Sequence, residues 1–560
     1  MTPIKKMLVC ALLLLLSIAK SHAANKIPWL HTDGTHIVDG QGQQVMLRGV
    51  NLGGWLVEEM WMMPFETKPP PGSKLDEIKD HVSLWGDVAK RFGPAEMTRI
   101  RAAQRDAWVN AGDFARIHAA GLDCVRLPFT YDLLEEPDGF SWLDKALNWA
   151  RENNIYVVLD MHGAPGRQSP SDHTGQAGVD QLFKDPKWVQ QTTSLWTKIA
   201  HRYRNRPEVA GYDLLNEPTG APDNSTLYLV QDRLYRAIRA VDKRHMIIIE
   251  EGYKGLDSFP RPAFADWQNV VLSWHHYNFN AKSATEQAAG LVHVASEATK
   301  FQKNRPTPVF IGETQLEPYG TPQALGEGLQ ALQEGGHSWT TWTYKTAMRG
   351  GGGGLWGWYH PAHPLQPLDV FHDSEAELLR KIEQLRSANL EENKAMTAMF
   401  QASVQWRPLP PLHEIVPTAQ AAPVSWHYTV DKPADDWFKT GFNDTGWKEG
   451  AAGFGNDWTF VGYVRTPWQT KDIWLRREFV LPDANLSHLK LLICHDDDAE
   501  VYLNGVLAAK LPGYTHTYDE EPISAAALAT LKPGRNVMAG HGYQEKAGQY
   551  LDAGIVGLPG

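Results

Sequence analysis

The first 344 residues carry eight short hydrophobic runs that are nearly continuous and rich in β-branched residues. These runs cover residues 46–52, 124–129, 156–161, 211–215, 246–250, 270–274, 308–311 and 338–344. Such runs are typical of strands that are buried on both faces, as in a parallel sheet. The pattern therefore predicts eight buried strands in this part of the chain.

Segments with helical periodicity lie between the runs, clearest at residues 113–120, 142–152, 188–203, 227–241 and 324–334. Strands that alternate with helices indicate βαβ units and a parallel sheet. Eight repeats favour closure into a (β/α)₈ barrel. The alternative is an open doubly wound sheet, but no Gly-rich dinucleotide fingerprint follows the first strand. We predict an α/β barrel as the first domain.

Two long insertions interrupt the repeats. Residues 58–110, rich in Pro and Trp, separate the first strand from its helix, and a run of five glycines at 350–354 follows the eighth strand. The glycine run is expected to act as a hinge. The aromatic residues at 355–359 can form a lid or pack on the barrel rim. Residues 373–405 are expected to form one long helical stretch that ends this domain.

The pattern changes after residue 406. Five prolines between residues 407 and 424 predict a stiff, extended linker. Beyond it, short hydrophobic runs at 474–480, 489–494 and 500–503 alternate with turn residues, which is typical of an all-β sandwich. We predict domains at 24–406 and 425–560, and we expect the many tryptophans of the second domain to lie in its core.

The N-terminus has the features of a secretory signal peptide. Lys5 and Lys6 precede an apolar run at 8–18, and small residues follow up to a cleavage point after Ala23. The run is short for a membrane span, and no later segment is long and apolar enough to be one. An uncleaved anchor is the alternative. We expect residues 1–23 to be removed and the protein to be secreted, either outside the cell or into a periplasm.

The net charge and the composition indicate which kinds of ligand this protein binds. Loss of Lys5, Lys6 and Lys20 would change the formal net charge from −11 to −14, which disfavours binding to nucleic acid. Only Cys124 and Cys494 would remain, in different domains, so we expect two buried thiols and no disulfide. The 22 tryptophans fit core packing, but they also favour carbohydrate, because flat indole faces stack on sugar rings.

Candidate chemistry lies at the strand ends, because active sites of such barrels form at the carboxyl ends of the strands. Polar or aromatic side chains occupy these positions on six of the eight strands: Arg126, His162, Asn216, Glu217, His275, Tyr277, Glu313 and Trp342. Any one of them can be a structural residue, such as a buried ion-pair partner or a turn. Together and in this order, they predict a shared catalytic bowl.

Two carboxylates across one cleft are the minimum for glycoside hydrolysis. We assign Glu217 as the acid/base that protonates the leaving oxygen and Glu313 as the nucleophile. Carboxyl groups about 5–5.5 Å apart retain the anomeric configuration, whereas about 6.5–9.5 Å gives inversion. The sequence alone contains no such distance.

The other strand-end residues can assist the two glutamates. Arg126 would favour the ionised form of Glu313, and Tyr277 would donate a hydrogen bond to the same carboxylate. Asn216 would bind the sugar 2-hydroxyl, and His275 would orient Glu217 and match its pKa to an acid role. Trp342 would form a floor for the sugar ring.

Two other kinds of site would need motifs that the sequence lacks. A metal site would use His162, His173, His275 and His276, but no pair has a tight ligand spacing such as H-E-x-x-H. A serine hydrolase would need a G-x-S-x-G elbow, which the sequence lacks. We expect no metal and no cofactor.

These motifs resemble glycoside hydrolase family 5, and most closely its exo-β-1,3-glucanase branch. The resemblance rests on residues 48–55, 159–166, 216–218, 275–277, 311–313 and 342–345. It implies a retaining barrel enzyme with the roles given above, and it adds His162 and Glu59 as sugar contacts. Residues 472–479, 496–505 and 531–537 resemble a galactose-binding-like jelly roll. That domain would bind sugar or buttress the barrel, and we favour buttressing.

The chain departs from the family pattern at Thr314-Gln315 and in the 58–110 insertion, so linkage and exo or endo action stay open. The expected function is hydrolysis of β-glucan, with a polysaccharide or oligosaccharide as substrate. Alternatives are cellulose, mannan or a glucosylceramide-type glycolipid as substrate, or a carbohydrate-binding protein without catalysis. The sequence does not predict an oligomeric state.

Overall fold

The computed structural model of the chain has two compact units, residues 1–408 and 409–560. It describes residues 27–559 except for 262–264, 349–354, 406–411, 457–462, 483–485, 516 and 546. The expected signal peptide and the glycine run lie outside the described residues. None of the described helices is long and apolar enough to cross a membrane.

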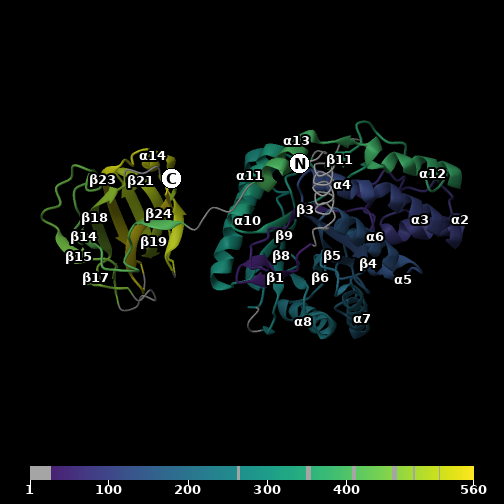
Figure 1. Ribbon diagram of the computed structural model, residues 1–560, viewed down its shortest axis with the longest axis horizontal. Helices are drawn as coiled ribbons and strands as arrows, with labels where there is room; N and C mark the ends of the chain where they lie inside the picture. Colours follow the sequence, from purple (N-terminus) through teal and green to yellow (C-terminus); the bar gives the residue numbers. More distant parts are fainter. Residues whose placement is uncertain are drawn as a thin grey trace, which may run out of the picture. The chain divides into compact units, whose positions relative to one another are not determined.

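The first unit contains a closed barrel of eight parallel strands (Figure 1). In barrel order the strands are β10 (Ser338–Thr341), β3 (Arg48–Asn51), β4 (Cys124–Thr130), β5 (Tyr156–Gly163), β6 (Val209–Asp213), β7 (Met246–Glu250), β8 (Val270–Tyr277) and β9 (Val309–Gln315). Each strand overlaps one of the eight hydrophobic runs. The predicted barrel is therefore confirmed.

Helices follow the strands, and all five helices expected from periodicity are present. They are α4 (Ala111–Ala119), α6 (Gly139–Glu152), α7 (Pro186–Tyr203), α8 (Asn224–Val241) and α11 (Pro322–Glu334). Their apolar faces join one large core that includes the barrel strands. The sequence analysis did not identify α10 (Ala284–Asn304), between β8 and β9, or the short α5 (Tyr131–Glu135).

The barrel interior is apolar at its amino end and polar at its carboxyl end. Early strand residues such as Cys124, Val158 and Ile248 form a small core with the hairpin of β1 (Leu30–Asp33) and β2 (His36–Asp39). Because side chains alternate along a strand, Arg126 and Glu250 lie two residues further on the same face. The hairpin and core fill the amino end, and polar groups collect at the other.

The 58–110 insertion is mostly helical rather than a loop. It contains η1 (Met60–Met62), α2 (His81–Phe92) and α3 (Pro94–Trp108), and Asp80 caps α2 by accepting a hydrogen bond from the Ser83 amide.

The expectation of one long helix at 373–405 is wrong. Two helices, α12 (Glu375–Ile382) and α13 (Lys394–Gln405), are separated by 3₁₀ turns (Glu383–Leu385 and Ser387–Asn389) and the short strand β12 (Glu391–Glu392), which pairs with β11 (Tyr359–His360).

The second unit consists of two sheets around their own hydrophobic core. One sheet contains β17 (Thr466–Pro467), β16 (Phe454–Gly455), β24 (Tyr550–Pro559), β19 (Leu486–Asp496) and β22 (Asp519–Pro522). The other contains β15 (Lys448–Ala451), β14 (Ser425–Thr429), β18 (Asp472–Leu481), β23 (Gly534–Tyr543), β20 (Asp498–Leu503) and β21 (Val506–Leu511). A short helix, α14 (Ala525–Leu528), completes it. The predicted all-β fold is confirmed, and Trp426 and Trp468 lie in its core.

The expected linker at 407–424 is partly built into this unit. Strand β13 (His413–Val416) pairs with β24, and Val416 is buried in the core. A four-residue strand next to prolines has too short an alternation to be recognised in the sequence. Cys124 and Cys494 are both free and buried, as expected, and burial raises the pKa of each thiol.

Candidate active site

Arg126 is the centre of the polar end of the barrel. Its guanidinium group is fully buried and lies beside the side chains of Asn51 (3.1 Å), Asp160 (3.2 Å), Asp213 (2.9 Å), Asn216 (2.8 Å), Glu250 (3.0 Å) and Glu313 (2.7 Å). Burial alone would lower the pKa of Arg126, but the surrounding carboxylates raise it. The arginine therefore stays charged and holds groups from five strands or strand ends in fixed positions.

Glu313 projects from β9 and is almost completely buried. One carboxylate oxygen accepts a hydrogen bond from Nη1 of Arg126 at 2.7 Å. The other accepts one from the hydroxyl of Tyr277 at 2.8 Å. Both oxygens are thus bound by donors, one of which carries a fixed positive charge, and these bonds fix the orientation of the carboxyl group.

Glu217 lies just beyond β6, in a left-handed backbone conformation with φ of 41°. Its amide donates to Oε2 of Glu250 at 2.7 Å, and this bond holds the unusual turn. Its Oε1 accepts hydrogen bonds from His275 Nδ1 at 2.9 Å and from the Tyr253 hydroxyl at 2.6 Å. A backbone conformation that is uncommon outside glycine is often found at functional sites.

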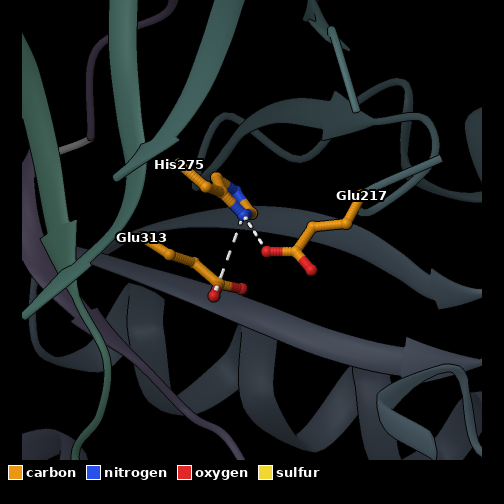
Figure 2. Close-up of side chains that lie close together, drawn as sticks. All are labelled: Glu217, His275 and Glu313. Carbon is orange, nitrogen blue, oxygen red and sulfur yellow. Dashed lines mark hydrogen bonds and ion pairs between the residues drawn. The ribbon is translucent and has the colours of Figure 1, made fainter. Parts of the chain in front are cut away.

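His275 lies between the two glutamates, as Figure 2 shows. Its Nδ1 is 2.9 Å from Glu217 and 3.8 Å from Glu313, and its Nε2 is 3.3 Å from Glu250. Burial alone would lower the pKa of His275, but Glu250, Glu313 and Glu217 raise it well above the ordinary value. The ring is therefore a cation that links the carboxylates.

The pKa of Glu217 shifts in the opposite direction. Burial alone would raise it, but the hydrogen bond from His275 and the nearby His173 lower it below the ordinary value. The sequence analysis expected His275 to match the pKa of Glu217 to an acid role. Within this pair the pKa of His275 is raised and that of Glu217 is lowered, so His275 holds a shared proton more strongly than Glu217 does.

The side of the site next to β5 is covered by His162, His173 and the side-chain amide of Asn216. His162 Nδ1 is 2.6 Å from Asp160, and its ring stacks on Trp342 with centroids 5.6 Å apart. Asn216 Nδ2 is 3.3 Å from His162 Nε2 and 3.0 Å from His173 Nδ1. Burial lowers the pKa of His162 well below its ordinary value, so this ring is neutral.

Glu59 lies at the edge of the same pocket, in the loop after β3, and only 7% of it is exposed. Its Oε2 accepts a hydrogen bond from Trp61 Nε1 at 2.7 Å, whereas Oε1 is buried without a hydrogen-bond partner. Burial raises the pKa of Glu59 to about 8, and the negative charges of Asp172, Glu313 and Glu217 add to the shift. Glu59 is therefore protonated at neutral pH.

These side chains enclose a pocket of about 310 Å³. Its lining consists of Glu59, Trp61, His162, His173, Glu217, Tyr253, Tyr277, Phe279, Glu313, Trp342 and Trp356. Trp356 contacts Trp61 and Phe279 at centroid distances of 5.3 and 6.3 Å. Of the aromatic residues at 355–359, Trp356 therefore lines the pocket, whereas Trp358 and Tyr359 pack in the core.

Part of this site also has the spacing of a metal-binding cluster. Among the described residues, one group has suitable spacing: one ligand atom each from Glu217, His275 and Glu313, all within 4.8 Å of one another. However, His275 already donates to Glu217, and Arg126 and Tyr277 donate to Glu313. The nearby charge of Arg126 also disfavours a cation. These side chains form a hydrogen-bonded network rather than a set of free ligands.

Residues 94–348 match the family model of cellulase, glycosyl hydrolase family 5. The matched segment includes seven of the eight barrel strands, β4 to β10, and both Glu217 and Glu313. The barrel is a glycosyl hydrolase family 5 domain. The predicted resemblance to family 5 is thereby confirmed.

Two named relatives match about half of this chain. The β-xylosidase of Phanerodontia chrysosporium is 30% identical over 289 residues, covering 50% of this chain and 57% of that protein. The probable glucan 1,3-β-glucosidase A of Neosartorya fischeri is 31% identical over 279 residues, covering 48% of this chain and 64% of that protein. This chain therefore spans about three fifths of their length. The crystal structure of an endogalactoceramidase aligns over 94% of this chain and 100% of that chain, with 16% identity and a TM-score of 0.45.

The family 5 domain brings all nine sequence-predicted residues to the carboxyl end of the barrel. Of these, Arg126, Asn216 and His275 reach the pocket through other side chains and are absent from its lining. Sequence reasoning missed Glu250, the last residue of the fifth predicted strand, although the strand-end rule applies to it. It also missed Tyr253 and Phe279, which lie in loops, and Trp61, which lies in the short 3₁₀ helix η1. His173 was considered only as a metal ligand.

Proposed function

We propose that the family 5 domain is a retaining hydrolase of β-glycosidic bonds, with Glu217 as acid/base and Glu313 as nucleophile. The observation that carries the proposal is the spacing of the two glutamates, because a carboxylate oxygen of one lies within 4.8 Å of a carboxylate oxygen of the other. This spacing is near the value of retaining enzymes, about 5–5.5 Å, whereas inverting enzymes place a water between carboxyl groups that stand about 6.5–9.5 Å apart.

The surroundings of the two glutamates support different roles. Glu313 faces Arg126 and Tyr277, whose hydrogen bonds to its two oxygens aim the carboxyl group at one position, as a nucleophile requires. Glu217 shares a proton with His275 across 2.9 Å, so a proton is available at the pair although the free carboxyl has a lowered pKa. Once substrate excludes water, that proton can move to Glu217 and then to the leaving oxygen.

The reaction then has two balanced steps. In the first, Glu313 attacks the anomeric carbon while the bond to the leaving oxygen breaks, and Glu217 gives that oxygen its proton. In the second, Glu217 removes a proton from water, the water oxygen bonds to the anomeric carbon, and Glu313 is released. Arg126 and Tyr277 stabilise the charge that returns to Glu313.

We propose a β-glucan or gluco-oligosaccharide as the substrate. The names of the relatives support a β-linked glucoside or xyloside. His162, Asn216 and Glu59 offer hydrogen bonds to a sugar ring, and Trp342 offers it a flat apolar face. Tyr253 and Phe279, 54% and 65% exposed at the mouth, would contact the group that leaves. We further propose that the protein is secreted after removal of residues 1–23, supported by their signal-like pattern.

The test measures sugar release from β-1,3-, β-1,4-, β-1,6- and mixed-linkage glucans, mannan, aryl β-glucoside and aryl β-xyloside. Glu313→Gln should lose at least about 1,000-fold in kcat, because the amide cannot form the glycosyl ester. Glu334→Gln, a change of the same kind on the exposed end of α11, is the control and should match the parent. Near-normal turnover by Glu313→Gln would contradict the nucleophile role.

The stereochemistry is tested separately by NMR during the first turnovers on an aryl β-glucoside. Retention predicts β-glucose as the first product, before it equilibrates in solution. An α-configured first product would refute the retaining mechanism but leave hydrolysis intact. Absence of hydrolysis on every glycoside would refute the proposed activity itself.

A further inference from the structure

His173 lies beside Glu217, yet neither the motifs nor the two-carboxylate mechanism use it. It belongs to the 3₁₀ turn η2 (Asp172–Thr174) in the loop after β5. Its Nε2 is 3.7 Å from Oε2 of Glu217, and its ring lines the pocket. Because Oε1 of Glu217 is bound by Tyr253 and His275, Oε2 is the oxygen that remains for a leaving group or a water.

The neighbouring amide fixes the orientation of the His173 ring hydrogens. Arg126 can only donate, so the atom of Asn216 that it contacts at 2.8 Å must be the carbonyl oxygen Oδ1. The amide nitrogen Nδ2 of Asn216 therefore faces Nδ1 of His173 at 3.0 Å and donates to it. A hydrogen on that Nδ1 would face the amide hydrogens, so the ring carries its hydrogen on Nε2, on the side of Glu217.

The insertion between β3 and α4 holds the His173 loop in place. The amide of Ala177 donates to Asp80 at 2.9 Å, and the amide of Val82 donates to the carbonyl of Gly175 at 3.0 Å. These contacts join the start of α2 to the residues that directly follow the His173 turn. The location of His173 therefore depends on the 58–110 insertion.

Helix α2 is itself anchored beside the pocket. His81 pairs with the buried Glu58, and Trp85 Nε1 donates to the same carboxylate at 3.0 Å. Glu58 directly precedes Glu59 in the chain. One anchored helix thus connects the backbone that carries Glu59 with the loop that carries His173.

We propose that His173 is a positioning residue that directs an Nε2 hydrogen at Oε2 of Glu217 and so favours the carboxylate form of that residue. The proposal rests on the acid/base role of Glu217. Two imidazoles then act on one carboxylate, His275 at Oε1 and His173 at Oε2. A donor aimed at Oε2 keeps Glu217 ionised, which is the form in which it can accept a proton from water in the second step.

Other ionisable groups also act on Glu217 and must be kept constant in any test. They are Glu59 in the loop after β3, Arg126 on β4, His162 on β5, Glu250 on β7, Tyr253 after β7, His275 on β8 and Glu313 on β9. A single substitution at His173 leaves all of them in the chain. A change in the titration of Glu217 is then attributable to the new side chain at position 173.

Two variants distinguish the contact of His173 Nδ1 with Asn216 from the contact of His173 Nε2 with Glu217. In His173→Asn, the side-chain oxygen can replace Nδ1 as the acceptor for Asn216, but no donor reaches Glu217. In His173→Gln, the longer amide can present its nitrogen near the position of Nε2. If the Nε2 hydrogen acts as proposed, His173→Asn should move the basic limb of the kcat/KM profile up by roughly 0.5–1 pH unit. His173→Gln should restore the limb to within about 0.3 unit of the parent.

The same shift should be seen without catalysis, by ¹³C NMR titration of the Glu217 carboxyl, assigned by its loss in Glu217→Gln. An unmoved limb and an unmoved Glu217 titration in His173→Asn, with melting temperature unchanged, would overturn the proposal. So would an equal shift in both variants. If the parent hydrolyses no glycoside, the proposed function fails, but the NMR titration still decides whether His173 acts on Glu217.

Discussion

Glu59 offers a sharp test of the electrostatics of the site, through the substitution Glu59→Gln. Its pKa is raised from 4.5 to about 8 by burial and by neighbouring carboxylates. A protonated glutamic acid and a glutamine have nearly the same shape, and both can donate a hydrogen bond. Glutamine can also accept from Trp61 with its oxygen and place its amide nitrogen where the unpaired Oε1 lies. The variant therefore removes the titration of Glu59 with little change in packing.

The sign of the effect on stability follows from proton linkage. Below pH 4.5 Glu59 is protonated in both the folded and the unfolded chain, so it causes no pH dependence. Between pH 4.5 and about 8, the unfolded chain loses this proton while the folded chain keeps it, so stability falls as pH rises. Above about pH 8 both states are ionised, and the loss stops increasing.

The magnitude can be calculated from the two pKa values. At about 1.36 kcal/mol per pKa unit, the change from pH 5 to pH 8 lowers the free energy of unfolding by at most about 3.5 kcal/mol. Other buried acids, such as Asp213 with a pKa raised to about 7, add to the decline in both proteins. The difference between parent and variant isolates the contribution of Glu59.

The assay is calorimetric unfolding of the full chain at pH 5 and pH 8, following the barrel transition. Glu59→Gln should become more stable relative to the parent on going from pH 5 to pH 8, and its melting temperature should fall less. Glu77→Gln removes a carboxylate whose side chain is 48% exposed in the same insertion and serves as the control. Equal losses of stability in the parent and in Glu59→Gln would show that Glu59 is ionised in the folded protein, and the reasoning would be refuted.

Two further variants test other parts of the structure. Arg126→Lys should lower kcat/KM by at least about 100-fold and the stability of the barrel by about 3 kcal/mol, because one ammonium cannot replace a guanidinium that contacts six side chains. Steady-state kinetics measure the first effect and calorimetry the second. A variant with near-normal kinetics and stability would contradict the central role of Arg126. Val416→Asp should destabilise the second unit by at least about 3 kcal/mol, because it places a charge in that core. The kcat of Val416→Asp should stay at the parental value. If Val416→Asp shifted the unfolding transition of the barrel rather than that of the second unit, β13 would not belong to the second unit.

The barrel could be predicted because its strands are buried on both faces. Continuous runs such as 246–250 then stand out from the amphipathic helices around them, and β7 has these same bounds. The helices of the insertion are less evident, because Pro and Trp next to α2 and α3 resemble loop composition. Strand β13 was missed for a similar reason, since four residues beside prolines have no visible period. Pairing with β24, a contact far away in the sequence, makes it a strand.

The candidate site was predictable where function follows from position on a strand. Arg126, His275 and Glu313 lie on barrel strands, and the barrel fold alone brings them together. Tyr253 and His173 reach Glu217 from loops, and their locations depend on backbone contacts that no local pattern specifies. The direction of the Glu217 pKa shift was also beyond the sequence, because it depends on a 2.9 Å contact with a histidine whose own pKa is raised.

The family 5 site contains more carboxyl groups than cations, and this imbalance limits its working pH range. Glu217, Glu250 and Glu313 lie around Arg126 and His275, with Asp213 and Glu59 close by. The folded site tolerates this density because some acids stay protonated, with pKa values raised to about 7 and about 8 for Asp213 and Glu59. Above that range each lost proton adds a negative charge near Glu313, which in the proposed mechanism recovers its own negative charge when the sugar departs. The same burial that gives Glu313 its fixed position therefore makes the site sensitive to alkaline pH.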